Sequence, residues 1–269
     1  MKTFAIHLLF DFKAGLRDKT LLIMNYIFPL GFYLMIGGIM PKLNPEYKDM
    51  LIPSMVMFTI LVSTILGMPN TLVTFRNNGI LRSYKINGIS KFSILATQVI
   101  STIFHAFIVT IIIIISAPIL FHVKHIEDIG ALILMFIAMS IACSGLAILI
   151  GTISDNTSVT VIYAQVLFLP SMLIGGLMFP SDALPKSIKG FSKLIPTTYG
   201  MDAFKALSVH ERGLFNPIYS IGILVLTGIL SYLLSFYLFR LDNNNTSESK
   251  NKFIALIALS PLVLGTLFI

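Results

Sequence analysis

Residues 175–202 read GGLMFPSDALPKSIKGFSKLIPTTYGMD, and the rest of the chain is organised around this stretch. It begins at the end of an apolar run, and prolines at positions 180 and 185 then interrupt regular structure. Between Pro185 and Pro196 the apolar side chains recur three, four and seven positions apart, so they share one helix face and leave the lysines largely elsewhere. Such a helix lies at the boundary of lipid and water, and Pro196 is expected to end it before another short helical run. We therefore expect residues 179–216 to form a re-entrant cap on one end of a helix bundle.

The composition excludes a soluble globular protein. Hydrophobic residues make up 56% of the 269 positions and charged residues 12%, whereas soluble domains carry about a quarter charged residues. The apolar runs are too continuous for a membrane β-barrel, so the fold class is an all-α bundle of membrane helices. The single cysteine, Cys143, excludes a disulfide framework. The net charge of +7 suits anionic lipids rather than nucleic acid, because the basic residues are scattered over loops.

Six apolar runs reach the length of about 20 residues that a bilayer crossing requires. They cover residues 21–40, 51–73, 93–120, 129–152, 159–178 and 217–239, and together form a core over residues 21–239. Residues 1–20 are partly amphipathic, which predicts an interfacial elbow helix and no removable signal peptide. Residues 240–252 form a polar linker. The apolar tail, residues 253–269, suits either a thin seventh span or an interfacial segment.

Lysine and arginine are unevenly distributed over the connections, and this sets the expected orientation. Most of them fall in the N-terminal segment, in the connection at residues 75–92 and at Arg240. The connections on the other side contain only Lys42, Lys48 and Lys124, interspersed with carboxylates. We therefore expect a cytoplasmic N-terminus in a multi-pass protein of the cell membrane. The basic cap departs from the rule, but a segment held by later packing has less influence on topology. Abundant isoleucine, lysine and asparagine suggest a bacterial source.

No carboxylate lies within a predicted span, which argues against a carrier driven by protons or sodium. His105 is the one ionisable side chain inside a span, and it is expected to hydrogen-bond between helices. Motifs of membrane enzymes are missing. His122 and His125 beside Glu127 have the spacing of metal ligands, but in a short wet loop they are expected to be ordinary polar residues. We expect no catalytic residue and no metal or other cofactor on this chain.

The sequence also lacks a phosphate-binding loop, so ATP and Mg²⁺ would act on a separate polypeptide. The connection at residues 75–92 is the expected contact with it. Basic side chains alternate with apolar ones there, and two glycines can end a helix, which predicts a short basic amphipathic helix lying flat under the bundle. The residues concerned are Arg76, Gly79, Leu81, Arg82, Lys85 and Gly88. A lipid-headgroup anchor is the alternative, and the two roles can coexist.

Two motifs resemble those of the ABC type-2 transporter permeases. One is Gly-Gly-x-x-x-Pro, followed by Leu-Pro and Ile-Pro-x-Thr-Tyr, and it consists of Gly175, Gly176, Pro180, Leu184, Pro185, Ile195, Pro196, Thr198, Tyr199 and Asp202. The other lies at the family's coupling helix, where Arg76, Gly79 and Leu81 match but Asn77 replaces an acidic residue. The resemblance implies a homodimer or a pair with a sister permease, two ABC ATPase subunits, and a cytosolic elbow helix. The apolar tail is a departure from the family pattern.

Polar residues within the spans mark helix contacts or a substrate route. The candidates for a route are Asn25, Ser63, Thr64, Asn70 and Gln165, because the first, second and fifth spans border the route in the family. Hydrogen bonding between helices is the alternative for each of them. Small residues in the fourth span (Ala138, Ala142, Gly145) and the sixth (Gly228, Ser231, Ser235) predict helix packing.

The resemblance implies a permease subunit of an ATP-driven exporter that moves an amphiphile such as a drug, a hydrophobic peptide, a lipid or a lipid-linked glycan. The alternative is a membrane partner of an ABC ATPase in signalling or self-immunity that transports nothing. An intramembrane enzyme is disfavoured by the missing catalytic residues. The cap either gates the extracellular end of the route or only shields the bundle.

Overall fold

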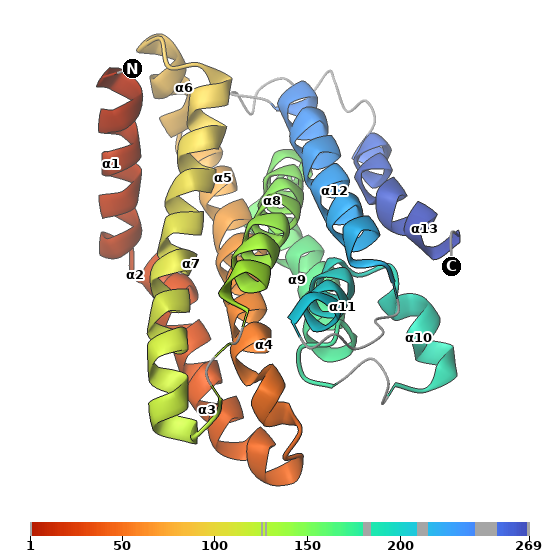
Figure 1. Ribbon diagram of the computed structural model, residues 1–269. Helices are drawn as coiled ribbons and strands as arrows, with labels where there is room; N and C mark the ends of the chain where they lie inside the picture. Colours follow the sequence, from red (N-terminus) through yellow and green to blue (C-terminus); the bar gives the residue numbers. More distant parts are fainter. Residues whose placement is uncertain are drawn as a thin grey trace.

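The computed structural model describes residues 2–124, 126, 128–179, 184–208, 215–239 and 252–267. All regular structure in these residues is helical, and the long helices pack side by side (Figure 1). The first span consists of α2 (Lys19–Leu22), η1 (Ile23–Ile27) and α3 (Phe28–Leu43), and the second of α4 (Tyr47–Leu61), η2 (Val62–Gly67) and α5 (Met68–Asn77). The others are α7 (Lys91–Phe121), α8 (Ile129–Ile153), α9 (Thr157–Ile174) and α12 (Pro217–Leu238). All six are long and apolar enough to cross a membrane, which confirms the predicted six-span all-α fold.

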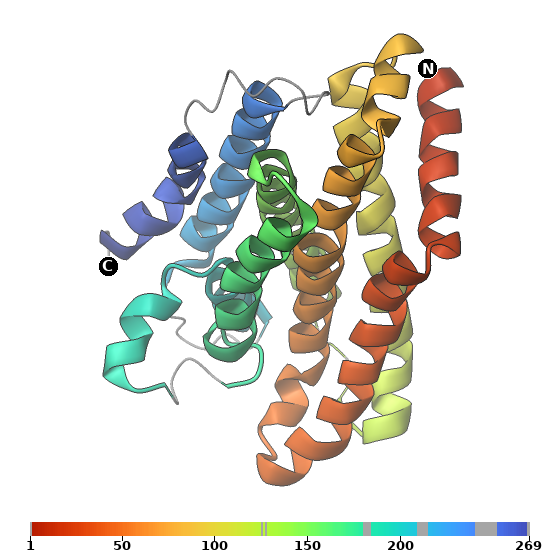
Figure 2. The same ribbon diagram turned by 180° about the vertical axis from the view of Figure 1, so that it is seen from behind.

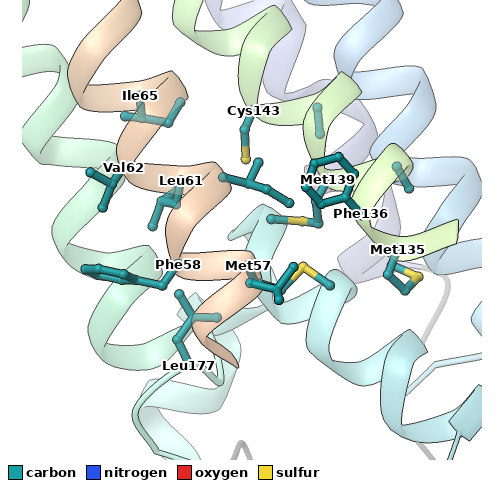
Figure 3. Packing of buried hydrophobic residues seen from close by; sticks show 14 of the residues in the cluster. Met57, Phe58, Leu61, Val62, Ile65, Met135, Phe136, Met139, Cys143 and Leu177 are labelled. Carbon is teal, nitrogen blue, oxygen red and sulfur yellow. The ribbon is translucent and has the colours of Figure 1, made fainter. Parts of the chain in front are cut away.

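The second and fourth spans form the centre of the bundle. Their most apolar windows are 89% and 78% buried, whereas those of the other four spans are between 22% and 33% buried. Figure 3 shows the core between them, where Met57 and Leu61 of α4 lie opposite Met139 and Cys143 of α8. The peripheral spans turn large apolar side chains outward, as lipid-facing helices do.

Each of the first two spans contains one π-helical segment, η1 or η2, and the two segments contact each other. A proline follows each of them closely, Pro29 after η1 and Pro69 after η2. A proline removes one backbone hydrogen bond, and its ring crowds the carbonyl four residues earlier. The wider π turn makes room for that carbonyl without ending the helix. The sequence analysis did not foresee these segments, although the prolines were visible.

Helix α8 packs along α12 through small residues, as predicted from the sequence. A Cβ atom at Gly145 would lie 2.7 Å from the backbone oxygen of Gly228, and one at Gly228 would lie 2.5 Å from the side chain of Ile141. The hydroxyls of Ser144 and Tyr232 form a hydrogen bond of 2.5 Å across the same contact. Close backbone approach and interhelical hydrogen bonds are the main sources of helix association in lipid.

Replacing Gly145 with alanine should lower the free energy of unfolding by about 1–3 kcal/mol, because the added methyl group has to displace the backbone of α12. Gly222→Ala, in α12, is the matched control, since a Cβ atom there meets nothing within 4 Å. Unfolding can be followed with a thiol-reactive fluorophore that reaches the buried Cys143 only when the bundle opens. Equal melting temperatures for both variants would contradict the close contact.

The helix expected before the first span is α1 (Lys2–Arg17), and it runs alongside α7 in both views (Figures 1 and 2). The ring of Phe12 stacks on that of His105 with centroids 4.5 Å apart, and the hydroxyl of Tyr26 lies 2.7 Å from Nδ1 of the same histidine. His105 therefore joins α1, η1 and α7, in agreement with the expected hydrogen bond between helices. The interfacial location of α1 stays a prediction.

The apolar tail forms η5 (Lys252–Leu259) and α13 (Ser260–Leu267), and it packs against α12. Its buried face consists of Ala255, Ala258, Pro261, Leu262 and Gly265. The tail is shorter than each of the six spans, and its crossing of the membrane as a seventh span stays a prediction. Residues 240–251 of the expected linker lie outside the described residues.

Candidate coupling surface, route and cap

The connection at residues 75–92 contains a short helix, α6 (Ile80–Ile86), with a glycine at each end. Gly79 and Gly88 have φ angles of 70° and 73°, which residues with a Cβ atom rarely adopt. After the helix, the N–H of Ile89 donates to the carbonyl of Tyr84 at 3.0 Å, a bond typical of a glycine-terminated helix. These turns fix where α6 begins and ends, as the two glycines predicted.

Helix α6 has one face on the bundle and one facing outward. Leu81 is fully buried and Tyr84 half-buried, whereas Arg82, Lys85 and Ile86 are exposed. Burial, followed by the negative charge of Asp11 on α1, raises the pKa of Tyr84. We call the exposed residues Arg82, Lys85 and Ile86 the coupling surface.

Arg76 does not belong to this surface. Its side chain is only 8% exposed, and Nη1 donates to the carbonyl of Thr152 at 3.3 Å. Nη2 donates to the carbonyl of Ser154, just beyond the end of α8. The last carbonyls of a helix have no hydrogen-bond partner within the helix. The guanidinium donates hydrogen bonds to them, and its positive charge is favourable at this end of the helix. Arg76 thus joins the end of α5 to the end of α8.

Two lysines at the same end of the bundle also join segments that are distant in the sequence. The ammonium of Lys91, at the start of α7, donates to the carbonyl of Phe239, which follows α12, at 3.1 Å. Lys252, at the start of η5, forms an ion pair with Asp155 between α8 and α9. The helix ends joined by these contacts lie at the same end as α6 (Figure 2).

Arg76→Gln should lower the melting temperature clearly, because it leaves buried carbonyls of α8 without a charged donor, a loss of about 1.5–3 kcal/mol. Arg82→Gln removes the same charge from an exposed position in the same segment and should leave the melting temperature unchanged. The thiol-fluorophore assay on the purified protein measures both. A stability loss in Arg82→Gln equal to that in Arg76→Gln would be inconsistent with a structural role peculiar to Arg76.

The route candidates lie close to the π-helical segments. Asn25 is in η1 and Ser63 and Thr64 are in η2, and all three are almost completely buried. Asn70 follows in α5, and Gln165 lies half-buried on α9, which packs against η2. The amide oxygens of Asn25 and Asn70 and the hydroxyl of Ser63 have no hydrogen-bond partner among the described residues. The structure thus groups neutral polar atoms around the first, second and fifth spans.

Gln98 of α7 was missed as a member of this region. Its amide nitrogen donates to the carbonyl of Met68 at 3.0 Å, directly after η2. A glutamine inside an apolar span was a visible signal, because buried amides in lipid need partners.

The cap begins with two glycines that have different tasks. A Cβ atom at Gly175 would lie 1.8 Å from the hydroxyl of Thr197, which itself donates to the carbonyl of Ser171 at 3.0 Å. Gly176 has a φ angle of 85° and turns the chain away from α9. The hydroxyl of Tyr47 then donates to the carbonyl of Leu177 at 2.6 Å. Pro180 lies outside the described residues.

The cap continues with α10 (Lys186–Ser192), which Pro185 precedes as its N-cap, and α11 (Pro196–Ser208). Pro196 is the first residue of α11, where a proline costs no hydrogen bond. Helix α11 packs against α8 and α12, and every residue from Pro196 to Phe204 is buried. Tyr199 is fully buried, stacks on Phe215 with centroids 4.8 Å apart and donates to the carbonyl of Leu262 in the tail at 3.3 Å. A gating or a shielding role for the cap stays a prediction.

Among the described residues no group of histidine, cysteine, aspartate and glutamate side chains could hold a metal ion. His125 and Glu127, which the sequence placed beside His122, lie outside the described residues.

Comparison with known proteins agrees with the two motifs. A family model described as "ABC-2 type transporter" matches residues 4–209, which include both the coupling segment and most of the cap. The chain belongs to the ABC-2 type transporter family. It is 26% identical over 97 residues to nodulation protein J of Bradyrhizobium diazoefficiens, an alignment that covers 36% of this chain and 37% of that protein. No solved structure matches. This ABC-2 permease is thus a membrane component of an ABC transporter.

Proposed function

We propose that this ABC-2 permease is the membrane subunit of an exporter, which moves an amphiphile out of the cell with energy from a separate ATPase. The observation that carries the proposal is the coupling surface on α6. It combines two exposed cations with the apolar side chain of Ile86, which is 78% exposed. Such a mixed surface suits a groove on a soluble protein better than the uniform interior of a membrane.

The position of α6 supports a role in transmitting motion. Leu81 fixes the helix to the bundle, and Arg76 joins the preceding helix to α8. The second and fourth spans, the most buried of the six, therefore both end close to α6. A push on α6 by an ATPase that closes around ATP and Mg²⁺ would reach the centre of the bundle directly.

The polar atoms around η1 and η2 support an amphiphilic substrate. They are neutral amides and hydroxyls surrounded by apolar side chains, and such a lining can hydrogen-bond a head group without binding a bare ion tightly. In this proposal the substrate is a drug, a hydrophobic peptide, a lipid or a lipid-linked glycan. A second permease chain, identical or related, completes the route, as the family resemblance implies.

The double variant Arg82→Glu with Lys85→Glu should weaken ATPase binding at least about tenfold, because like charges replace complementary ones at the interface. Export of fluorescent amphiphilic dyes from cells should fall in parallel. Co-purification of an ABC ATPase co-expressed with this permease measures the first effect, and dye efflux measures the second.

The matched control is Lys42→Glu with Lys48→Glu, which reverses two exposed charges in the connection between the first two spans. It should leave ATPase binding and efflux unchanged. Undiminished ATPase binding in the α6 variant would refute the coupling surface. A permease that binds the ATPase through α6 but exports no amphiphile would support the non-transporting alternative.

The proposed orientation is tested by accessible cysteines. Cysteines placed at Lys48 and Lys124 should react with an impermeant thiol reagent added to intact cells, whereas one at Lys85 should react only after the membrane is opened. The native Cys143 is buried and gives no background. Labelling at position 85 in sealed cells would show that the orientation is the opposite one and that α6 does not face the cytoplasm.

A further inference from the structure

A cavity of about 810 Å³ lies between α9 and η5, with α8 behind it and α10 at one end. Cavities of about 300–1,000 Å³ are typical of small-molecule sites. Its lining is aliphatic and aromatic, and Lys252 is the one charged side chain among the described residues that line it. None of the five route candidates lines it, so it is separate from the region around η1 and η2.

The cavity opens sideways, toward the surface that faces lipid. Val166 on α9 and Leu256 on η5 line it and are 69% and 61% exposed, as side chains at an open rim are. Along α9 the lining extends from Tyr163 to Ile174, which corresponds to about 16 Å at 1.5 Å per residue. That length is close to half of a hydrocarbon core of about 30 Å. The cavity therefore has the depth of one leaflet.

The two ends of the cavity differ in chemistry. At one end, Lys252 pairs with Asp155, and the two side chains are 43% and 70% exposed. An exposed ion pair contributes at most about 1 kcal/mol, so an incoming phosphate or carboxylate can compete for the lysine. At the other end, Phe191 of α10 and Leu194, which follows that helix, present apolar side chains that are 68% and 39% exposed. Their exposure has no explanation within the bundle.

We propose that this cavity binds the acyl chain of an amphiphile whose anionic head group lies at Lys252. The acyl chain lies between α9 and η5 and reaches the apolar side of α10. A resident membrane phospholipid and an exported lipid share this chemistry. The proposal goes beyond the exporter function, since it depends on the cavity and not on the ATPase.

The test uses the full-length chain in phosphatidylcholine vesicles that contain a small fraction of phosphatidylglycerol with a photoreactive group on its acyl chain. After illumination, mass spectrometry of the digested protein identifies the labelled residues. We expect label concentrated on the cavity sides of α9 and η5. The cavity-filling variants Val166→Trp and Leu256→Trp should reduce that label severalfold.

Matched controls are Val161→Trp on α9 and Leu264→Trp on α13, which are 45% and 51% exposed and do not line the cavity. They should leave the label unchanged, and the thiol-fluorophore assay verifies that every variant is folded. Label spread evenly over the outward apolar faces, or unchanged in the filling variants, would overturn the proposal.

The head-group part of the proposal has its own variant. Lys252→Glu should reduce labelling by the photoreactive phosphatidylglycerol but not by a photoreactive diacylglycerol, which has the same chains and no charge. Lys48→Glu, an exposed charge remote from the cavity, should change neither. Equal labelling by both probes in the Lys252 variant would show that this lysine does not bind the head group.

Efflux distinguishes the two sources of the ligand. If the filled variants still export dye, the occupant is a resident phospholipid, and if they fold and bind the ATPase but lose export, the occupant is on the substrate route. Failure of the exporter function itself would appear as missing dye efflux by the unmodified permease, while the labelling result would be unaffected.

Discussion

Backbone groups without a hydrogen-bond partner are not tolerated in hydrocarbon, and most of the unusual features of this structure satisfy that constraint. Where the chain leaves a helix, a side chain from a distant segment supplies the missing partner. Tyr47 donates to the carbonyl of Leu177 at the entrance to the cap, and Thr197 donates to that of Ser171 near the end of α9. Arg76 does the same for the end of α8. Each of these long-range hydrogen bonds thus lies where a helix stops.

The same constraint relates the coupling segment to the core. Helix α6 is short and has glycine turns on both sides, so its own backbone could not hold it in place. Leu81 packs into the bundle, and Arg76 fastens the preceding turn to α8. The exposed cations of α6 therefore lie on a helix whose supports are the two most buried spans, and two side chains set the position of α6 relative to the core.

The six spans could be predicted closely from the sequence, because length and apolarity alone decide whether a helix can cross a bilayer. The turns at Gly79 and Gly88 were equally accessible, since few other residues adopt their φ angles. The hydrogen-bond partners of Arg76 could not be predicted from the sequence, because every residue has a backbone carbonyl. Only the fold brings three of these carbonyls to one guanidinium. Sequence analysis placed Pro196 at the end of a helix, whereas it begins α11, as proline favours either side of a boundary. The packing of the tail was also missed, because its buried face consists of residues that are common in any apolar segment, namely Ala255, Ala258, Pro261, Leu262 and Gly265.

The bond between Tyr199 and Leu262 has a consequence for biosynthesis. Membrane proteins are inserted from the N-terminus during translation, and their domains generally fold in that order. Leu262 lies 63 residues after Tyr199, beyond the sixth span, so α11 is synthesised well before this partner is available. Until the tail emerges, the hydroxyl of Tyr199 lacks both the carbonyl of Leu262 and the close contact with Gly265. The tail thus completes the cap only after all six spans have been made, and a ribosome that stops between the sixth span and the tail leaves the cap unfinished.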